Sequence, residues 1–376
     1  MLDKAEYILV ATVALVAGAS CAKVEVEEGE LIPVSFTTYR QRTETKADVS
    51  YVAPGGDFAA GAEIGVFAFY HNGNGATDAS WDAEQSAGNN IPDYMYNQSI
   101  IKQDDGTWLY SPIKYWPNET GASATSQHID KVSFWGHYPR NAAGLNLYAA
   151  GTTTAYDNQT SGLPKVTFTQ NEDPDQMIDL MFTDLQKDLY KNDAANHGHI
   201  TNGAVNLVFK HALALVEFQL AEGTGAELNL LELTHIKKSG TLDNPYTVPF
   251  VWSNVSGEYT THIEDLNVNE TTLLRILAIP QTISADATFS LNYNITFESS
   301  DPTHPEPIVY TGDSFSVKLF DNTNADPTKR YGVTAWEAGK HYIYKIAAGL
   351  DRIEFEEIVE LSDDWSVGNN NISVPE

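Results

Sequence analysis

Short apolar segments separated by turn residues recur along the whole chain, and they constrain its fold more than any other feature. Each segment is rich in Val, Ile, Phe, Tyr and Thr and is bounded by Gly, Asn, Asp or Pro, a pattern typical of β-strands. Clear examples are Glu63 to Tyr70 and Lys131 to Pro139. Asp104-Asp105-Gly106 lies between apolar stretches over Tyr94 to Lys102 and Thr107 to Tyr110, which predicts a hairpin because Gly supplies the positive φ of the turn.

Helical periodicity is weak throughout. No segment shows a long apolar period of 3.6 residues, and the best helical candidate is the short stretch Asp184 to Asn192. The sequence therefore predicts an all-β protein.

The length of the chain, 376 residues, fits two domains of roughly 150 to 200 residues each. Residues 193–203 are the poorest in large apolar side chains between two β-rich halves, which places a boundary near residue 203. We therefore predict two antiparallel β-sandwich domains in tandem, over residues 43–203 and 204–376. The strand candidates of the second half are Ala204 to Leu220, Leu273 to Ala278, Thr288 to Phe297 and Ser314 to Leu319.

The N-terminal segment has the form of an export signal. Ile8 to Ser20 is an apolar run of 13 residues, about 20 Å long as a helix and shorter than the roughly 30 Å hydrocarbon core of a membrane. It ends in small residues directly before Cys21, as in a bacterial lipoprotein signal. We predict a signal peptide over 1–20 and a lipid on Cys21. Because position 18 is Gly rather than a larger aliphatic residue, an ordinary signal peptide followed by an unrelated cysteine is the alternative.

A strand-like stretch and a basic loop follow this signal. Leu31 to Tyr39 has partly alternating apolar character, and the polar segment after it lacks any strand or helix periodicity. The apolar positions of the stretch are Leu31, Val34, Phe36 and Tyr39. The basic positions after it are Arg40, Arg42 and Lys46. The sequence predicts an exposed loop that a trypsin-like protease can cut.

Charge and cysteine content exclude several classes of function. The chain has 22 basic and 51 acidic residues, a formal net charge of −29. Such a surface repels phosphate backbones, so nucleic acid is not expected as a partner. Cys21 is the single cysteine, so neither an intramolecular disulfide nor a cysteine-based zinc cluster can form.

Motifs of catalysis and metal binding are weak or missing. The sequence has no G-x-S-x-G, H-E-x-x-H or G-x-x-x-x-G-K-[ST] motif. His197 and His199 have the spacing of metal ligands but no evident third ligand. The acidic stretches 171–175 and 321–326 fit turns better than cation sites. We predict no catalytic residue, metal or cofactor, although a hydrolase with two facing carboxylates stays open as a rival.

Aromatic residues suggest a second rival. Trp108, Trp116 and Trp135 could stack on sugar rings if their faces reached solvent, which would make the chain a carbohydrate-binding surface lipoprotein. Tryptophan in a β-sandwich more often fills the core.

Seven segments, taken in chain order, carry motifs of one known family. They include KYWP at 114–117, FKHAL at 209–213 and WEAGKHYIY at 336–344. Together they resemble the fimbrillin family of Bacteroidetes, the subunits of type V pili. The segments are Phe58 to Tyr70, Asp105 to Pro117, Val132 to Pro139, Asp179 to Phe182, Val205 to Phe218, Ala278 to Gln281 and Trp336 to Tyr344.

The resemblance implies two transthyretin-like β-sandwich domains and export as a lipidated precursor. It also implies that a trypsin-like protease removes the N-terminal strand within a propeptide over 21–42. Carried over to this sequence, the removed strand is Leu31 to Tyr39, with cleavage after Arg40 or Arg42 and Lys46 as a third choice. Removal of residues 1–42 takes away six acids and four bases, which leaves 45 acids and 18 bases, a net charge of −27.

The resemblance further implies that a strand from a neighbouring subunit fills the place of the removed one. Its expected source is the C-terminal stretch 353–374. The donor positions predicted there are Ile353, Phe355, Ile358, Trp365 and Val367. A chain with both a removable strand and a C-terminal tail fits a stalk subunit, and a tip adhesin is the alternative.

The predicted partners and location follow from this assignment. The partners are other fimbrial subunits, the protease, the outer-membrane lipid that Cys21 enters in the precursor, and a host glycan or protein if the subunit is adhesive. The predicted location is the cell outer membrane and the surface fimbria.

Overall fold

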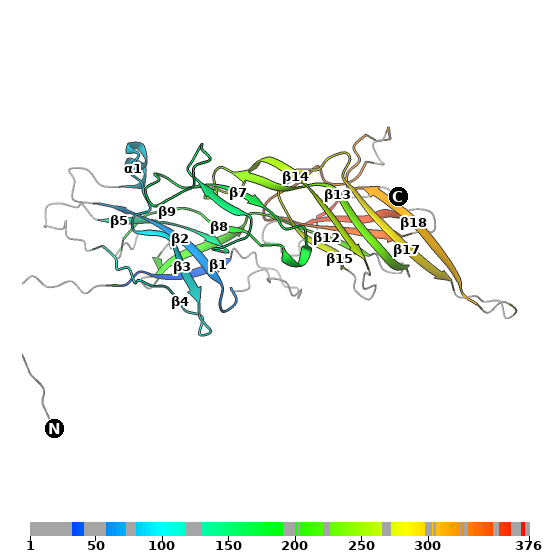
Figure 1. Ribbon diagram of the computed structural model, residues 1–376, viewed down its shortest axis with the longest axis horizontal. Helices are drawn as coiled ribbons and strands as arrows, with labels where there is room; N and C mark the ends of the chain where they lie inside the picture. The colour runs from blue at the N-terminus through cyan, green and yellow to red at the C-terminus, as the bar shows by residue number, and fades with distance from the viewer. Residues whose placement is uncertain are drawn as a thin grey trace, which may run out of the picture. The chain divides into compact units, whose positions relative to one another are not determined.

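The structure is a computed structural model, and the regular secondary structure of the residues it describes is almost entirely β-strand (Figure 1). This confirms the all-β prediction. The described residues are 32–40, 58–72, 80–117, 130–190, 200–201, 204–220, 226–264, 272–297, 303, 306–323, 325–326, 330–348, 353–361 and 370–372.

A nine-stranded sheet is formed mainly by the first half of the chain. Its order is β1-β11-β8-β5-β2-β3-β4, and β10 and β9 pair with β11 and β5. Its strands are β1 (Ser35–Arg40), β2 (Glu63–His71), β3 (Met95–Lys102), β4 (Trp108–Leu109), β5 (Lys131–Tyr138), β8 (Met181–Thr183), β9 (Gln186–Leu189), β10 (Ile200–Thr201) and β11 (Ala204–His211).

The central strands of this sheet are covered on both faces. In β2, Ile64 and Val66 belong to one apolar core, while Phe67 and Phe69 belong to another. A strand buried on both sides requires an almost continuous apolar sequence rather than strict alternation, which explains the IGVFAF stretch of β2. The predicted hairpin is also present: β3 and β4 pair antiparallel, and Gly106 in their turn has φ +86°.

The second half of the chain provides two further sheets and a short ladder. The six-stranded sheet has the order β18-β17-β13-β7-β6, with β14 beside β13, and the five-stranded sheet has the order β15-β12-β20-β21-β22. Strands of the six-stranded sheet are β6 (Leu145–Tyr148), β7 (Lys165–Thr169), β13 (Ala226–Leu242), β14 (Trp252–Glu264), β17 (Thr288–Phe297) and β18 (Ile308–Lys318). The other strands are β12 (Ala214–Leu220), β15 (Thr272–Ala278), β20 (His341–Ala348), β21 (Ile353–Leu361), β22 (Asn370–Ile372) and the pair β16 (Gln281–Thr282) and β19 (Ala335–Trp336).

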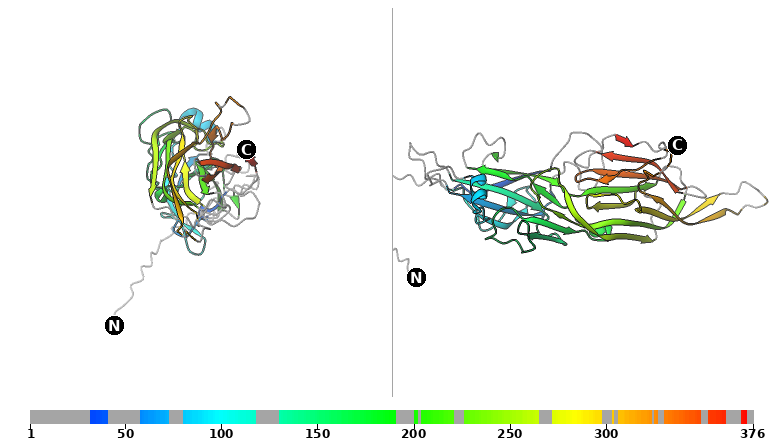
Figure 2. Two further views of the ribbon diagram at one scale, coloured as in Figure 1. Left: turned by 90° about the vertical axis from the view of Figure 1, so that its right-hand side faces the viewer. Right: turned by 90° about the horizontal axis from the view of Figure 1, so that it is seen from above.

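An aromatic core joins these two sheets. Phe218 of β12 stacks on Phe289 of β17 with ring centroids 4.6 Å apart, and on Tyr344 of β20 at 5.0 Å. The end-on view in Figure 2 separates the two layers, with the red C-terminal strands facing the yellow ones. Burial of such rings is the largest apolar contribution to a sandwich core.

Pairing across the predicted domain boundary is a further feature. The long strand β13 pairs with β7 of the first half, with Leu242 opposite Val166. β1 with β11 and β12 with β20 are parallel pairs within otherwise antiparallel sheets. The division into two transthyretin-like domains at residue 203 stays a prediction.

The helix predicted from the local sequence pattern at Asp184 to Asn192 is not present where it was expected. The stretch Asp184 to Asn192 contains strand β9, because Gln186 and Leu189 are buried against β5. The α-helix is instead α1 (Trp81–Ala87), which begins at the N-cap Ser80 and ends at Gly88 with φ 73°. A 3₁₀ turn, η1, covers Pro174–Gln176. Within the described residues, no helix has the length and apolar character needed to span a membrane.

Candidate functional site

The first strand, β1, forms one end of the nine-stranded sheet. It pairs in parallel with β11, and the register places Phe36 opposite Val205 and Arg40 opposite Phe209. A parallel pair needs a long connection, and here more than one hundred residues of chain separate the two strands. β1 is thus held by residues that are remote in the sequence.

The residues just before β1 are bonded on their other side to a different segment. The Val34 amide donates to the Lys114 carbonyl at 2.9 Å, and the Trp116 amide donates to the Ile32 carbonyl at 2.9 Å. The Tyr110 hydroxyl donates to the Val34 carbonyl at 2.7 Å. The segment 32–40 therefore has two sets of backbone partners: residues 35–40 pair with β11, and residues 32–34 bond to residues 114–116.

Two side chains of this segment fill the core beneath it. Val34 and Phe36 are buried, whereas Pro33 and Ser35 between them are exposed. The Phe36 ring makes edge contacts with Tyr110 at 5.7 Å and Phe134 at 5.9 Å between centroids. Full burial of an apolar side chain of this size contributes about 1.5–3 kcal/mol. Burial therefore alternates from one residue to the next, as in a strand with one buried face, and this agrees with the partly alternating apolar pattern of the sequence.

The structure describes some of the remaining predicted site residues and not others. The backbone of Tyr39 and Arg40 ends β1 opposite Val208 and Phe209. Five other predicted positions lie outside the described residues: Cys21, Leu31, Arg42, Trp365 and Val367.

The described part of the predicted donor lies in the same chain's own fold. It forms β21, which pairs with β20, and Phe355 and Ile358 are buried in the core of the second half. The Phe355 ring contacts Tyr344 at 5.2 Å and Tyr331 at 6.2 Å. Ile353 pairs with Ala348 at the start of the strand. β21 and β22 together form one edge of their sheet.

The tryptophans of the carbohydrate hypothesis do not form a platform. Trp108, Trp116 and Trp135 are all buried, and they pack in the cores on the two faces of the nine-stranded sheet. The core positions that were the alternative for these tryptophans are the ones observed, and the three rings cannot form a sugar-stacking site because none presents a face to solvent.

A buried histidine makes stability depend on pH. His137 is buried, and its Nε2 lies 3.0 Å from Oδ1 of Asn97. The packing is tight, since a Cβ at Gly65 would lie 2.4 Å from that nitrogen. Burial lowers the pKa of His137 from 6.5 to about 4. The neutral ring is thus the form that the fold accepts.

We expect the unfolding free energy to fall as the pH drops from 7.5 to 4. In that window the unfolded chain binds a proton at this ring and the folded chain does not, so the stabilisation is complete above about pH 6.5 and is lost below it, by on the order of 3 kcal/mol. Urea unfolding of wild type and His137→Asn at both pH values checks this. The variant should lose much of the pH dependence, whereas His235→Asn, at an exposed site, should keep it. An unchanged dependence in His137→Asn would contradict the assignment.

Comparison with known families decides the identity of the chain. A family model described as fimbrillin-like matches residues 45–360. The chain belongs to the fimbrillin-like family. Membership makes it a fimbrial or adhesin subunit of the cell surface, and a structural protein rather than an enzyme. No curated protein matches this fimbrillin-like chain significantly in sequence.

Solved structures of similar proteins come from Bacteroides and Porphyromonas species. A candidate cell adhesion protein from Bacteroides uniformis shares 15% identity and a TM-score of 0.48, covering 89% of this chain and 98% of its own. A second candidate cell adhesion protein, from Bacteroides ovatus, has 14% identity and a TM-score of 0.48, and the match covers 90% of this chain and 99% of that one. The C-terminally truncated tip fimbrial protein Mfa3 from Porphyromonas gingivalis has 11% identity and a TM-score of 0.33, and the match covers 81% of this chain and 95% of that one.

One polar cluster of the fimbrillin-like chain superficially resembles a catalytic site. His71 Nε2 lies 2.9 Å from Ser133 Oγ, and both residues are buried. Ser133 Oγ also accepts the Asp188 amide at 3.0 Å, while the Asp188 carboxylate accepts the Trp81 amide at 2.7 Å. The carboxylate therefore holds the start of α1 rather than orienting the imidazole.

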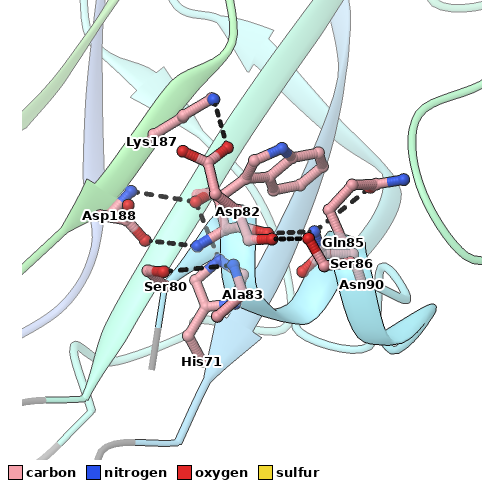
Figure 3. Close-up of polar contacts among 11 residues, drawn as sticks. His71, Ser80, Asp82, Ala83, Gln85, Ser86, Asn90, Lys187 and Asp188 are labelled. Atoms are coloured by element: carbon pink, nitrogen blue, oxygen red, sulfur yellow. Dashed lines mark hydrogen bonds and ion pairs between the residues drawn. The ribbon is translucent and has the colours of Figure 1, made fainter. Parts of the chain in front are cut away.

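The same cluster anchors α1 at several points, as Figure 3 shows. Lys187 pairs with Asp82 at 2.7 Å, and Asn90 donates to the Trp81 carbonyl at 2.8 Å. Ser80 accepts the Ala83 amide as an N-cap at 3.3 Å. Sequence reasoning missed this arrangement because its members are far apart in the chain. Within the described residues, no three potential ligands gather as a metal site would require.

Proposed function

We propose that the chain is a structural subunit of a surface fimbria that polymerises by donor-strand exchange. It is exported as a precursor lipidated on Cys21, and a trypsin-like protease removes the propeptide after Arg40 or Arg42. The observation that supports this proposal is that segment 32–40 pairs with β11 at a sheet edge, bonds to residues 114–116, and is followed in the sequence by Arg42 and Lys46.

Loss of this segment has two physical consequences. The edge of β11 loses its ladder partner, which leaves backbone N–H and C=O groups without strand partners. The volume of Val34 and Phe36 also opens as an apolar slot beside Phe134 and Tyr110. An incoming extended segment with alternating apolar side chains repairs both defects at once, as in β-strand addition.

The donor in this proposal is the C-terminal stretch with Ile353, Phe355, Ile358, Trp365 and Val367. Its described part lies at one side of its sheet, so its departure breaks the ladder between β20 and β21 and leaves the order β15-β12-β20 in place. Vacating the core site of a buried aromatic ring costs about 3–5 kcal/mol, so the exchange requires that the acceptor slot bury comparable surface. A chain that both accepts and donates belongs in the stalk.

Trypsin treatment of the purified precursor tests the proposal. We expect a discrete product that begins at Gln41 or Thr43 and that forms SDS-resistant polymers. The matched control is the triple variant Arg40→Gln, Arg42→Gln, Lys46→Gln, which lacks all three candidate cleavage sites and should stay monomeric under the same conditions. A ragged digest without assembly would count against the proposed function.

A further inference from the structure

Four large apolar side chains are exposed along one short stretch beside the slot. We call them the entry patch, because the stretch that carries them ends at Tyr115, which forms a bridge with Pro33 at the start of the segment 32–40. They are Ile101 (40% exposed), Leu109 (55%), Ile113 (46%) and Tyr115 (44%). Exposed apolar groups that gather in one place mark interaction sites more often than single ones do.

The position of the entry patch follows from strand pairing. Ile101 and Leu109 are cross-strand partners in the β3–β4 hairpin, so their side chains lie together on one face. That face is the outer one, because Trp108 next to Leu109 points into the core. Tyr115 forms a bridge with Pro33, at the N-terminal end of the segment 32–40. The patch thus borders the N-terminal end of the slot.

The polarity of β1 determines which end of a donor strand lies there. β1 runs parallel to β11, and its N-terminal side is the one bonded to residues 114–116. A donor that takes over the hydrogen bonds of β1 with the same polarity has its own N-terminal end beside Tyr115. Because the donor is a C-terminal tail, the body of the donating subunit is attached at that end.

We propose that the entry patch is the surface on which the body of the donating subunit rests. The partner is a second copy of this chain, and the inference depends on the proposed strand exchange. The argument is continuity, because the body must emerge from the slot beside Tyr115, at one end of the entry patch. The contact joins different surfaces of two subunits, which is the kind of interface that builds an open filament rather than a closed dimer.

Electrostatics makes an apolar contact necessary. Each processed subunit carries 45 acids and 18 bases, a net charge of −27, so two bodies brought together repel each other. Burial of the entry patch is not weakened by salt, whereas the repulsion is screened over about 10 Å at 0.1 M ionic strength. The patch therefore supplies attraction that the charged surface cannot.

The rate at which a maleimide labels the introduced cysteine of Leu109→Cys tests this inference. Cys21 is the single cysteine and leaves with the propeptide, so the processed variant carries one thiol. Its maleimide labelling rate is measured in the trypsin-processed monomer, in the polymer, and in the monomer with its slot filled by a synthetic peptide of residues 353–376. Val251→Cys, at a site 72% exposed and away from the patch, is the matched control. Ile113→Cys provides a second position within the patch.

We expect the polymer to label at Leu109→Cys about tenfold more slowly than the monomer, the effect of a contact worth about 1.4 kcal/mol. The peptide complex should label as fast as the monomer, and Val251→Cys should label equally in all three. Equal labelling of monomer and polymer at both patch positions would overturn the inference while leaving strand exchange intact. Protection by the peptide alone would also overturn it, because the donor strand rather than the body would then cover the patch. If no polymer forms at all, the proposed function fails and the inference with it.

Discussion

Replacing Phe36 by Ala is expected to lower the unfolding free energy of the precursor by about 3–5 kcal/mol, the cost of emptying a buried aromatic site. The ring is enclosed by Tyr110 and Phe134, and little of it reaches solvent. The processed chain lacks residue 36, so Phe36→Ala precursor and wild type should yield products of equal stability after trypsin. Urea unfolding before and after cleavage measures both quantities.

The matched control for this prediction is Ser35→Ala. Ser35 is the exposed neighbour of Phe36 on the same strand, so its loss should change stability by no more than about 0.5 kcal/mol. A Phe36→Ala precursor as stable as wild type would show that β1 contributes nothing to the fold. In that case the slot described above would not depend on this strand.

Deletion of residues 362–376 is expected to abolish polymerisation and to leave a folded monomer. The deletion removes Trp365 and Val367 from the predicted donor but keeps Phe355 and Ile358 in the core of the second half. Such a chain can accept a strand and cannot donate a complete one. Gel filtration and SDS-resistant ladders after trypsin treatment measure the loss of polymer, and circular dichroism measures the retained fold.

Mixing provides the control for this deletion. An acceptor that cannot donate should terminate growing chains, so small amounts of the deletion variant should shorten wild-type polymers. The same amount of the uncleaved triple variant Arg40→Gln, Arg42→Gln, Lys46→Gln should shorten them less, because its slot is still filled by β1. Normal ladders from the deletion variant by itself would place the donor outside residues 362–376.

Local pattern was sufficient for most strands of this fold. The apolar runs at 63–70 and 131–139 became β2 and β5, and the turn at Gly106 became the hairpin of β3 and β4. These features depend on neighbouring residues, so a single sequence carries them. The helix predicted over the segment that contains β9 was wrong, because pairing with the distant strand β5 outweighed the weak helical period of the local sequence.

Long-range partners were beyond the reach of the sequence. Nothing near Val34 or Phe36 indicates that their strand runs parallel to β11 or bonds to residues 114–116. The same holds for the pairing of β13 with β7 and for the Trp81, Ser133 and Asp188 cluster at α1. The family motifs pointed to the right fold, but they carry no register. The entry patch likewise became visible only once exposure was known for each side chain.

The pairing of β1 with β11 joins residues 169 positions apart in the chain. Such a contact forms late in folding, because the intervening chain must be made and brought together first. During that interval β11 has an open edge that the tail of any neighbour could enter. A strand carried on the same polypeptide has the advantage of high effective concentration, in the millimolar range for a short flexible linker and lower for a longer one. In the proposed assembly route, each new chain therefore fills its own slot before it meets its neighbours, and cleavage by the protease rather than folding sets the time of assembly.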